Sequence, residues 1–66
     1  MTKTEYVHNY LAPLVKVIDK SITAVTYSRF GDIEYIYLLF KSGYIKINVT
    51  GAGLKSLAEE VIRRIA

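Results

Sequence analysis

Tyrosines and lysines recur at alternate positions in the second half of this chain, and their side chains are suited to molecular recognition. Tyr35, Tyr37 and Tyr44 offer flat rings that can pack against a protein surface or stack on nucleic-acid bases. Lys41 and Lys46 add cations that can contact phosphates. We therefore take the following as candidate partner-binding residues: Tyr35, Tyr37, Leu39, Lys41, Tyr44, Lys46 and Asn48.

The other reactive side chains do not form a pattern that supports catalysis or metal binding. The chain has no cysteine, so it has no thiol nucleophile and no cysteine-based zinc site. His8 is the single histidine, and we interpret it as a solvated helix residue rather than a general base or ligand. The carboxylates are scattered along the chain or placed beside cations: Asp19, Asp32, Glu34, Glu59 and Glu60. We predict a protein that is not an enzyme, with no catalytic residues, no metal and no cofactor.

Three predicted strands position the tyrosines and lysines. Alternating β-branched and aromatic residues predict strands over 22–30, 33–41 and 44–49. Gly31-Asp32 and Ser42-Gly43 separate these runs and are typical of tight hairpin turns, because glycine tolerates a positive φ. The sequence therefore predicts a three-stranded antiparallel meander.

Two-residue loops at both turns fix which side of the sheet each residue faces. Ile33 then lies opposite Phe30, and Tyr44 lies opposite Lys41. One face is almost wholly apolar and is the predicted core face: Val25, Tyr27, Ile36, Leu38, Phe40, Ile45, Ile47 and Val49. The opposite face is a mixture of aromatic, basic and small polar residues, which we name the tyrosine face: Ile22, Ala24, Thr26, Ser28, Phe30, Ile33, Tyr35, Tyr37, Leu39, Lys41, Tyr44, Lys46, Asn48 and Thr50.

A charged pair supports this register. Arg29 falls opposite Glu34, and an opposite-charge cross-strand pair contributes about 0.2–1 kcal/mol. The tyrosine face is too polar for a sealed core and too aromatic for an ordinary solvent-facing surface, so any functional hypothesis begins there.

The end of the chain predicts an amphipathic helix. Apolar residues recur there at helical spacing and should pack on the core face of the sheet: Leu54, Leu57, Ala58, Val61, Ile62 and Ile65. Thr50 or Gly51 is expected near the helix cap. On the outer side we expect two ion pairs of i,i+4 spacing within a solvated charged face: Glu59–Arg63 and Glu60–Arg64.

A shorter helix is predicted before the sheet. Thr4 is the expected cap of a helix that begins near Glu5 and ends near Leu11 or Ala12, because Pro13 disrupts a helix interior. Residues Leu14 to Ile18 are then extended or form a second short turn, with an extra strand there as the alternative. Whether this helix covers the tyrosine face stays open.

The whole chain predicts an α+β fold of order α-β-β-β-α, in one domain over residues 1–66. No apolar run reaches the length needed to cross a bilayer, and no basic and apolar leader begins the chain, so we expect a cytoplasmic protein without membrane contact. The net charge of +3 permits nucleic-acid contact but does not demand it.

Residues 41–51 and the helix after them carry a family resemblance. Lys41-Ser42-Gly43-Tyr44, then 47–51 (Ile-Asn-Val-Thr-Gly), then Leu54, Ala58 and Val61 resemble the end of small uncharacterised proteins of phages and prophages of Gram-positive bacteria. In those proteins a strand with a "GY … INVT" pattern leads into an amphipathic helix. The resemblance implies a phage origin, and brings no catalytic or binding residue with it.

The leading functional hypothesis is a protein-interaction module, with a protein partner or a homodimer on the tyrosine face or at a strand edge. The phage resemblance implies a small regulator or inhibitor of a host factor as the role of such a module. The alternative is single-stranded nucleic-acid binding, in which Tyr35, Tyr37 and Tyr44 stack on bases while Lys41 and Lys46 contact phosphates.

Overall fold

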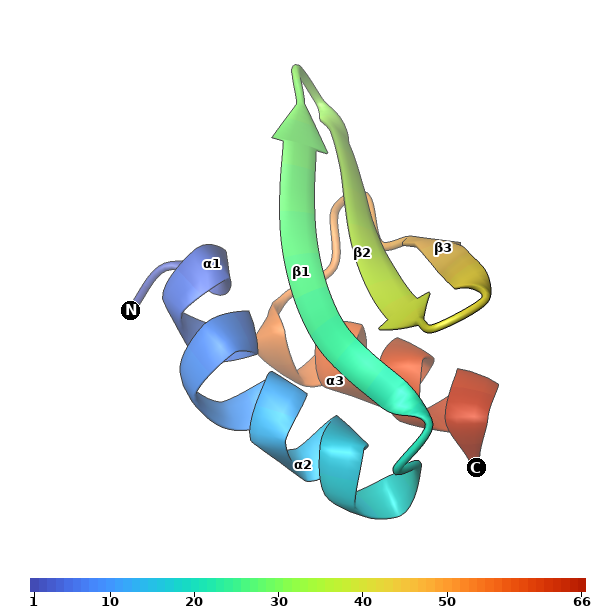
Figure 1. The fold of residues 1–66 in the computed structure, drawn as a ribbon. Coiled ribbons are helices and arrows are strands. Elements are labelled where there is room, and N and C mark those ends of the chain that lie inside the picture. Colours follow the sequence, from blue (N-terminus) through green and yellow to red (C-terminus); the bar gives the residue numbers. More distant parts are fainter.

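The computed structural model describes residues 1–66 and has an N-terminal helix, three antiparallel strands in one sheet, and a C-terminal helix (Figure 1). This arrangement confirms the predicted α+β order. The strands lie in the order β1-β2-β3, so β2 is central. The elements in chain order are α1 (Lys3–Tyr6), η1 (Val7–Leu11, a π-helical segment), α2 (Ala12–Ile18), β1 (Ile22–Phe30), β2 (Ile33–Phe40), β3 (Gly43–Asn48) and α3 (Leu54–Ile65).

The N-terminal helix begins earlier than expected, because Thr2 rather than Thr4 is its cap. The Thr2 hydroxyl oxygen accepts a hydrogen bond from the backbone N–H of Glu5 at 3.1 Å. In return, the Thr2 N–H donates to the Glu5 carboxylate at 2.9 Å. This capping box satisfies two backbone donors that have no partner inside the helix.

The prediction that this helix ends near Leu11 or Ala12 is wrong, because the helix continues through Pro13 to Ile18. In a regular α-helix the proline ring clashes with the carbonyl four residues earlier. Here the preceding turn is π-helical, and the Ala12 N–H donates to the Val7 carbonyl, five residues back. The wider turn relieves the clash, and Pro13 lies in the first turn of α2, where a missing N–H costs little.

The β1–β2 hairpin has the predicted turn, with Phe30 opposite Ile33 and a positive φ of 62° at Gly31. Near the start of β1, however, the register shifts because Thr23 is an extra, unpaired residue. The bulge turns Ile22 to the core face, where it is buried. The prediction that Ile22 lies on the tyrosine face is therefore wrong.

The β2–β3 turn is displaced from its predicted position. Phe40 pairs with Gly43, so the loop comprises residues 41 and 42, and Tyr44 lies opposite Leu39 rather than Lys41. The shift amounts to two residues of pairing. Because side chains alternate with a period of two, residues keep the faces predicted for them.

The predicted ion pair between Arg29 and Glu34 does not form, although the two residues do lie opposite each other. The Arg29 side chain instead donates to the backbone carbonyl of Gly31 at 2.8 Å. The Glu34 carboxylate is bound by Lys3 from the N-terminal helix, at 2.6 Å. The pairing of β1 with β2 beside their turn was therefore predicted correctly, although the side chains of Arg29 and Glu34 bind other partners.

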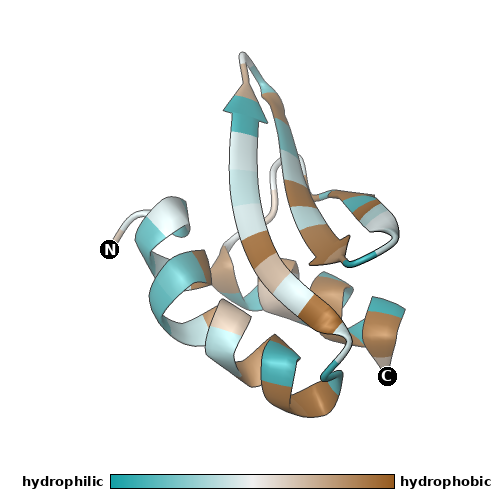
Figure 2. Ribbon diagram, viewed as in Figure 1, coloured by the Kyte–Doolittle hydropathy of each residue, from teal (hydrophilic) through white to brown (hydrophobic).

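Both helices pack against the core face of the sheet, and apolar segments gather where helices and strands meet (Figure 2). The core is one cluster: Val7, Leu11, Ala12, Val15, Ile22, Val25, Ile36, Leu38, Ile47, Val49, Leu57 and Val61. Tyr27 and Phe40 are partly buried against it, as their predicted face requires. Ile45 is 37% exposed, because β3 is an outer strand.

The C-terminal helix confirms the predicted apolar stripe, since Leu57 and Val61 are fully buried in the core. Its N-cap is Gly53 rather than Thr50 or Gly51, and no side chain caps it.

Candidate functional site

The tyrosine face is not covered by either helix. Val7, Leu11 and Val15 of the N-terminal helix belong to the core cluster on the opposite side of the sheet. Tyr44 is 63% exposed, and the other two tyrosines of the candidate site are half-buried among their neighbours. The possibility that the N-terminal helix covers these tyrosines is therefore excluded.

Three tyrosine rings form a continuous row, which we name the tyrosine row. The ring centroids of Tyr35 and Tyr37 are 6.2 Å apart, with an angle of 51° between the ring planes. The centroids of Tyr37 and Tyr44 are 5.7 Å apart, at 57°. Aromatic pairs prefer such tilted contacts at this separation. The rings therefore hold one another in place before any partner binds.

Lys46 belongs to the same cluster. It lies opposite Tyr37 in the sheet, and its ammonium nitrogen is 4.0 Å from the centroid of the Tyr35 ring. This is the geometry of a cation–π contact. It fixes a positive charge beside the tyrosine row.

The remaining candidate residues are placed less centrally. Leu39 lies opposite Tyr44 and is half-buried beside the row. Lys41 is exposed in the turn after β2, beyond the paired strands. Asn48 is the last residue of β3, and its side-chain oxygen accepts a hydrogen bond from the Thr50 N–H at 2.9 Å. Asn48 therefore serves the chain turn after β3, and the compact part of the site is the tyrosine row with Leu39 and Lys46.

Small residues of β1 complete this surface. Ala24, Thr26 and Ser28 lie opposite Leu39, Tyr37 and Tyr35. They were predicted on this face but not among the binding residues. Because these β1 side chains are small, they leave the tyrosine rings accessible from the β1 side. A run of small residues opposite the tyrosines is the sequence signal that could have identified them as part of the site.

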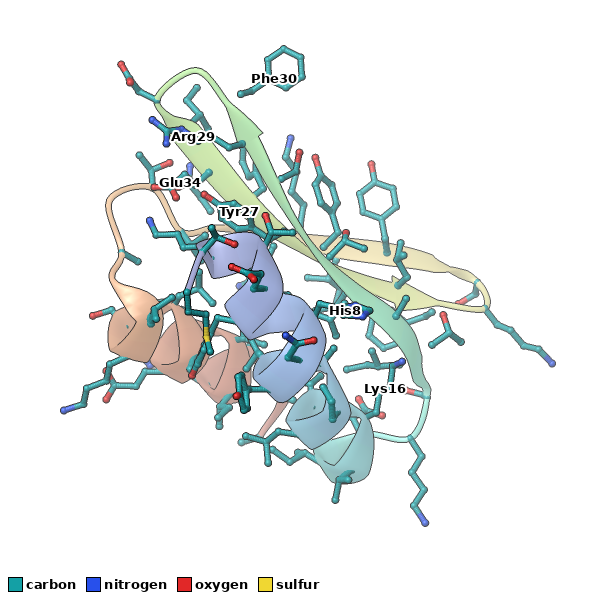
Figure 3. All side chains as sticks on the ribbon, turned by 90° about the vertical axis from the view of Figure 1, so that its left-hand side faces the viewer. His8, Lys16, Tyr27, Arg29, Phe30 and Glu34 are labelled. Carbon is teal, nitrogen blue, oxygen red and sulfur yellow. The ribbon has the colours of Figure 1, made fainter.

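Glu34 forms the main polar cluster of the protein, close to Tyr27 and beneath Arg29 in Figure 3. Its carboxylate accepts hydrogen bonds from Lys3, from the Tyr27 hydroxyl and from the Gly51 N–H. These bonds, that from Lys3 foremost, lower the pKa of Glu34 to about 2. Burial, and next the bond to Glu34, raises the pKa of Tyr27. A carboxylate held so firmly in its charged form is suited to joining three segments rather than to proton transfer.

Two hollows lie beside the outer strands. The larger, of about 550 Å³, is lined by Ile47, Asn48, Glu60, Arg63 and Arg64. Arg63 pairs with Glu60 at 3.0 Å, an i,i+3 contact rather than either of the predicted i,i+4 pairs. We predicted these arginines on a solvated face of the helix and did not predict their position beside β3.

The second hollow, of about 270 Å³, lies between the N-terminal helix and β1. His8 lines it and is exposed, as expected for a solvated helix residue (Figure 3). No three histidine, aspartate or glutamate side chains lie close enough together to hold a metal ion.

None of the helices combines the length and the apolar character needed to cross a bilayer. No family model matches the chain, and comparisons with curated proteins and with solved structures give no match.

Proposed function

We propose that this protein is a non-enzymatic interaction module that forms a homodimer through its tyrosine face. The observation that supports the proposal is the tyrosine row, which lies on the side of the sheet away from both helices. Tyrosine is enriched at protein interfaces because its ring is large, rigid and amphipathic. The mutual packing of the rings reduces the conformational entropy that binding must remove.

A second copy of the chain is a suitable occupant of this face. Two-fold contacts require a surface that is complementary to itself. The tyrosine face meets this requirement because it carries both aromatic rings and a lysine that binds such rings. The phage resemblance of residues 41–51 adds a biological role to the proposal, that of a regulator or inhibitor of a host factor.

Sedimentation equilibrium over a range of protein concentrations tests the proposal. The wild-type chain is expected to dimerise, and Tyr37→Ala should weaken the dimer at least tenfold while its thermal melt stays cooperative. Tyr10→Ala is the matched control, since Tyr10 is 57% exposed on the N-terminal helix. A wild-type chain that stays monomeric, or equal weakening by both substitutions, would contradict the proposal.

Single-stranded nucleic-acid binding is the second candidate, and the position of Lys46 beside Tyr35 favours it. Bases stack on aromatic side chains while cations contact the phosphates. Against it stands the small number of cations, because Lys46 is the single lysine within the tyrosine row. Titration with an oligonucleotide at two salt concentrations separates the candidates: this function requires binding that falls steeply with salt.

A further inference from the structure

The outer edge of β3 is unpaired along its length (Figure 1). The Val49 N–H donates to the Glu34 carbonyl at 2.9 Å, which fixes the alternation of hydrogen bonds between β2 and β3. With the observed register, the backbone groups of Ile45 and Ile47 face β2. The alternate residues direct their backbone N–H and C=O groups away from the sheet: Tyr44, Lys46 and Asn48.

A positively charged hollow adjoins this edge. It lies between the end of β3 and the later turns of α3, and Ile47 supplies its apolar wall. Two arginines and one glutamate contribute its charges. Arg63 is paired with Glu60, whereas Arg64 has no ion-pair partner in the chain. The hollow therefore has a net positive charge and an unneutralised guanidinium group.

The charges decide which strand fits this edge. A second copy that pairs all three outward-facing residues antiparallel would place Lys46 opposite the Lys46 of the other copy. It would also bring two arginine-lined hollows together, and like charges across strands are destabilising. A segment with carboxylate side chains meets the opposite condition, because a carboxylate that enters the hollow neutralises the unpaired guanidinium group of Arg64.

We propose that the edge of β3 binds an extended acidic peptide, which adds to the sheet as a fourth strand. Its backbone pairs with Tyr44, Lys46 and Asn48, and every second side chain turns toward the hollow. There its carboxylates contact Arg63 and Arg64. β3 has six residues, so the peptide needs about six residues in extended form. This site uses the backbone edge of β3 and the hollow beside α3 rather than the side chains of the tyrosine face, and it does not rest on the proposed dimer.

A blocked peptide of alternating glutamate and valine is the probe. Titrated into ¹⁵N-labelled protein, it should shift the amide signals of Tyr44, Lys46 and Asn48 and slow their hydrogen exchange. The same peptide with lysine in place of glutamate should bind at least tenfold more weakly. Equal binding of the two peptides, or no binding at low salt, would overturn the proposal.

Peptide N-methylation separates strand addition from simple charge attraction. Two versions of the glutamate–valine peptide carry N-methyl groups on alternate residues, one version on the glutamates and the other on the valines. Only one set of amides faces β3 in a paired strand, so one version should lose binding and the other should keep it. If both N-methylated versions keep their binding, the peptide is attracted by charge without pairing to β3, and the proposal is contradicted.

Matched protein variants test the role of the hollow. Arg64→Gln is expected to weaken binding of the glutamate–valine peptide at least fivefold. Arg29→Gln removes the same charge at the hairpin tip, away from the hollow, and should leave binding unchanged (Figure 3). Equal effects of the two substitutions would mean that overall charge alone attracts the peptide, and the site would be wrong.

Discussion

Lys3 and Glu34 form an ion pair with 2.6 Å between the ammonium nitrogen and a carboxylate oxygen, although they are 31 positions apart in the chain. The same carboxylate accepts hydrogen bonds from Tyr27 and Gly51. It thereby joins the N-terminal helix, the β1–β2 hairpin and the connection to α3. These contacts act together with the apolar core, which packs both helices on the side of the sheet opposite the tyrosine face.

Replacement of the buried carboxylate should lower stability. Glu34→Gln removes the charge that binds Lys3 and leaves Tyr27 and Gly51 with a weaker acceptor. We expect a clear fall in the midpoint of urea unfolding. Glu60→Gln is the control, because it breaks the exposed pair with Arg63 and should shift the midpoint little. Equal shifts in both variants would contradict the structural role of Glu34.

Acid should destabilise the protein over a defined interval of pH. Hydrogen bonds hold the pKa of Glu34 at about 2, whereas the ordinary value is 4.5. Between these two pH values the unfolded chain binds a proton at Glu34 more readily than the folded chain does. The stability that the charged carboxylate contributes is therefore complete above about pH 4.5 and is lost as the pH falls toward 2. The pKa values of Glu5 and Asp19 are lowered in the same direction by hydrogen bonds from Thr2 and Ser21.

Urea unfolding from pH 7 to pH 2 measures this effect. The midpoint should decline through the interval for the wild type and decline less steeply for Glu34→Gln, which retains the smaller effects of Glu5 and Asp19. A variant with the same slope as the wild type would mean that Glu34 is not the main acid-sensitive group.

The connection before α3 requires glycine at one position but not at another. Gly51 has a φ of 77°, so Gly51→Ala should cost about 1–2 kcal/mol through backbone strain. Gly53 has an ordinary φ of −74° at the helix cap, with open space where a side chain would start. Gly53→Ser should therefore leave stability unchanged or raise it by a few tenths of a kcal/mol. Urea titration gives the free energy of unfolding of both variants. A larger loss of stability in Gly53→Ser than in Gly51→Ala would contradict the described turn.

The contact between α3 and the sheet is tested by a cavity. Leu57 is fully buried in the core cluster, so Leu57→Ala should lower the free energy of unfolding by about 2–5 kcal/mol. Leu54 is half-buried at the helix start, and Leu54→Ala should cost less. Calorimetric melts of both variants provide the comparison. A Leu57→Ala variant that melts at the same temperature as the wild type would exclude the observed packing.

The sequence was sufficient to predict the strands and most of their faces, because alternation with a period of two is a local property. It failed at Ile22, since the bulge at Thr23 reverses the alternation without a distinctive residue. It also failed at Pro13, where a π-helical turn accommodates a residue that ordinarily ends a helix. Both failures come from backbone adjustments that depend on packing against the rest of the fold.

The candidate site was predictable in part for the same reason. Tyr35 and Tyr37 are two residues apart on one strand, so their shared face follows from the sequence. The position of Tyr44 against Tyr37 depended on the turn, whose pairing was predicted two residues away from its true place. The binding of Lys3 by Glu34 and the position of Arg64 beside β3 required the tertiary arrangement of the helices.

An isotope-filtered NOE experiment on a mixture of ¹³C-labelled and unlabelled protein tests the proposed dimer most directly. We expect intermolecular contacts from the rings of Tyr35, Tyr37 and Tyr44 to the tyrosine face of the other copy. These contacts should vanish on dilution and in Tyr37→Ala. Intermolecular contacts from another surface alone would contradict a dimer that forms through the tyrosine face. So would the absence of intermolecular contacts at a concentration where sedimentation gives a dimer.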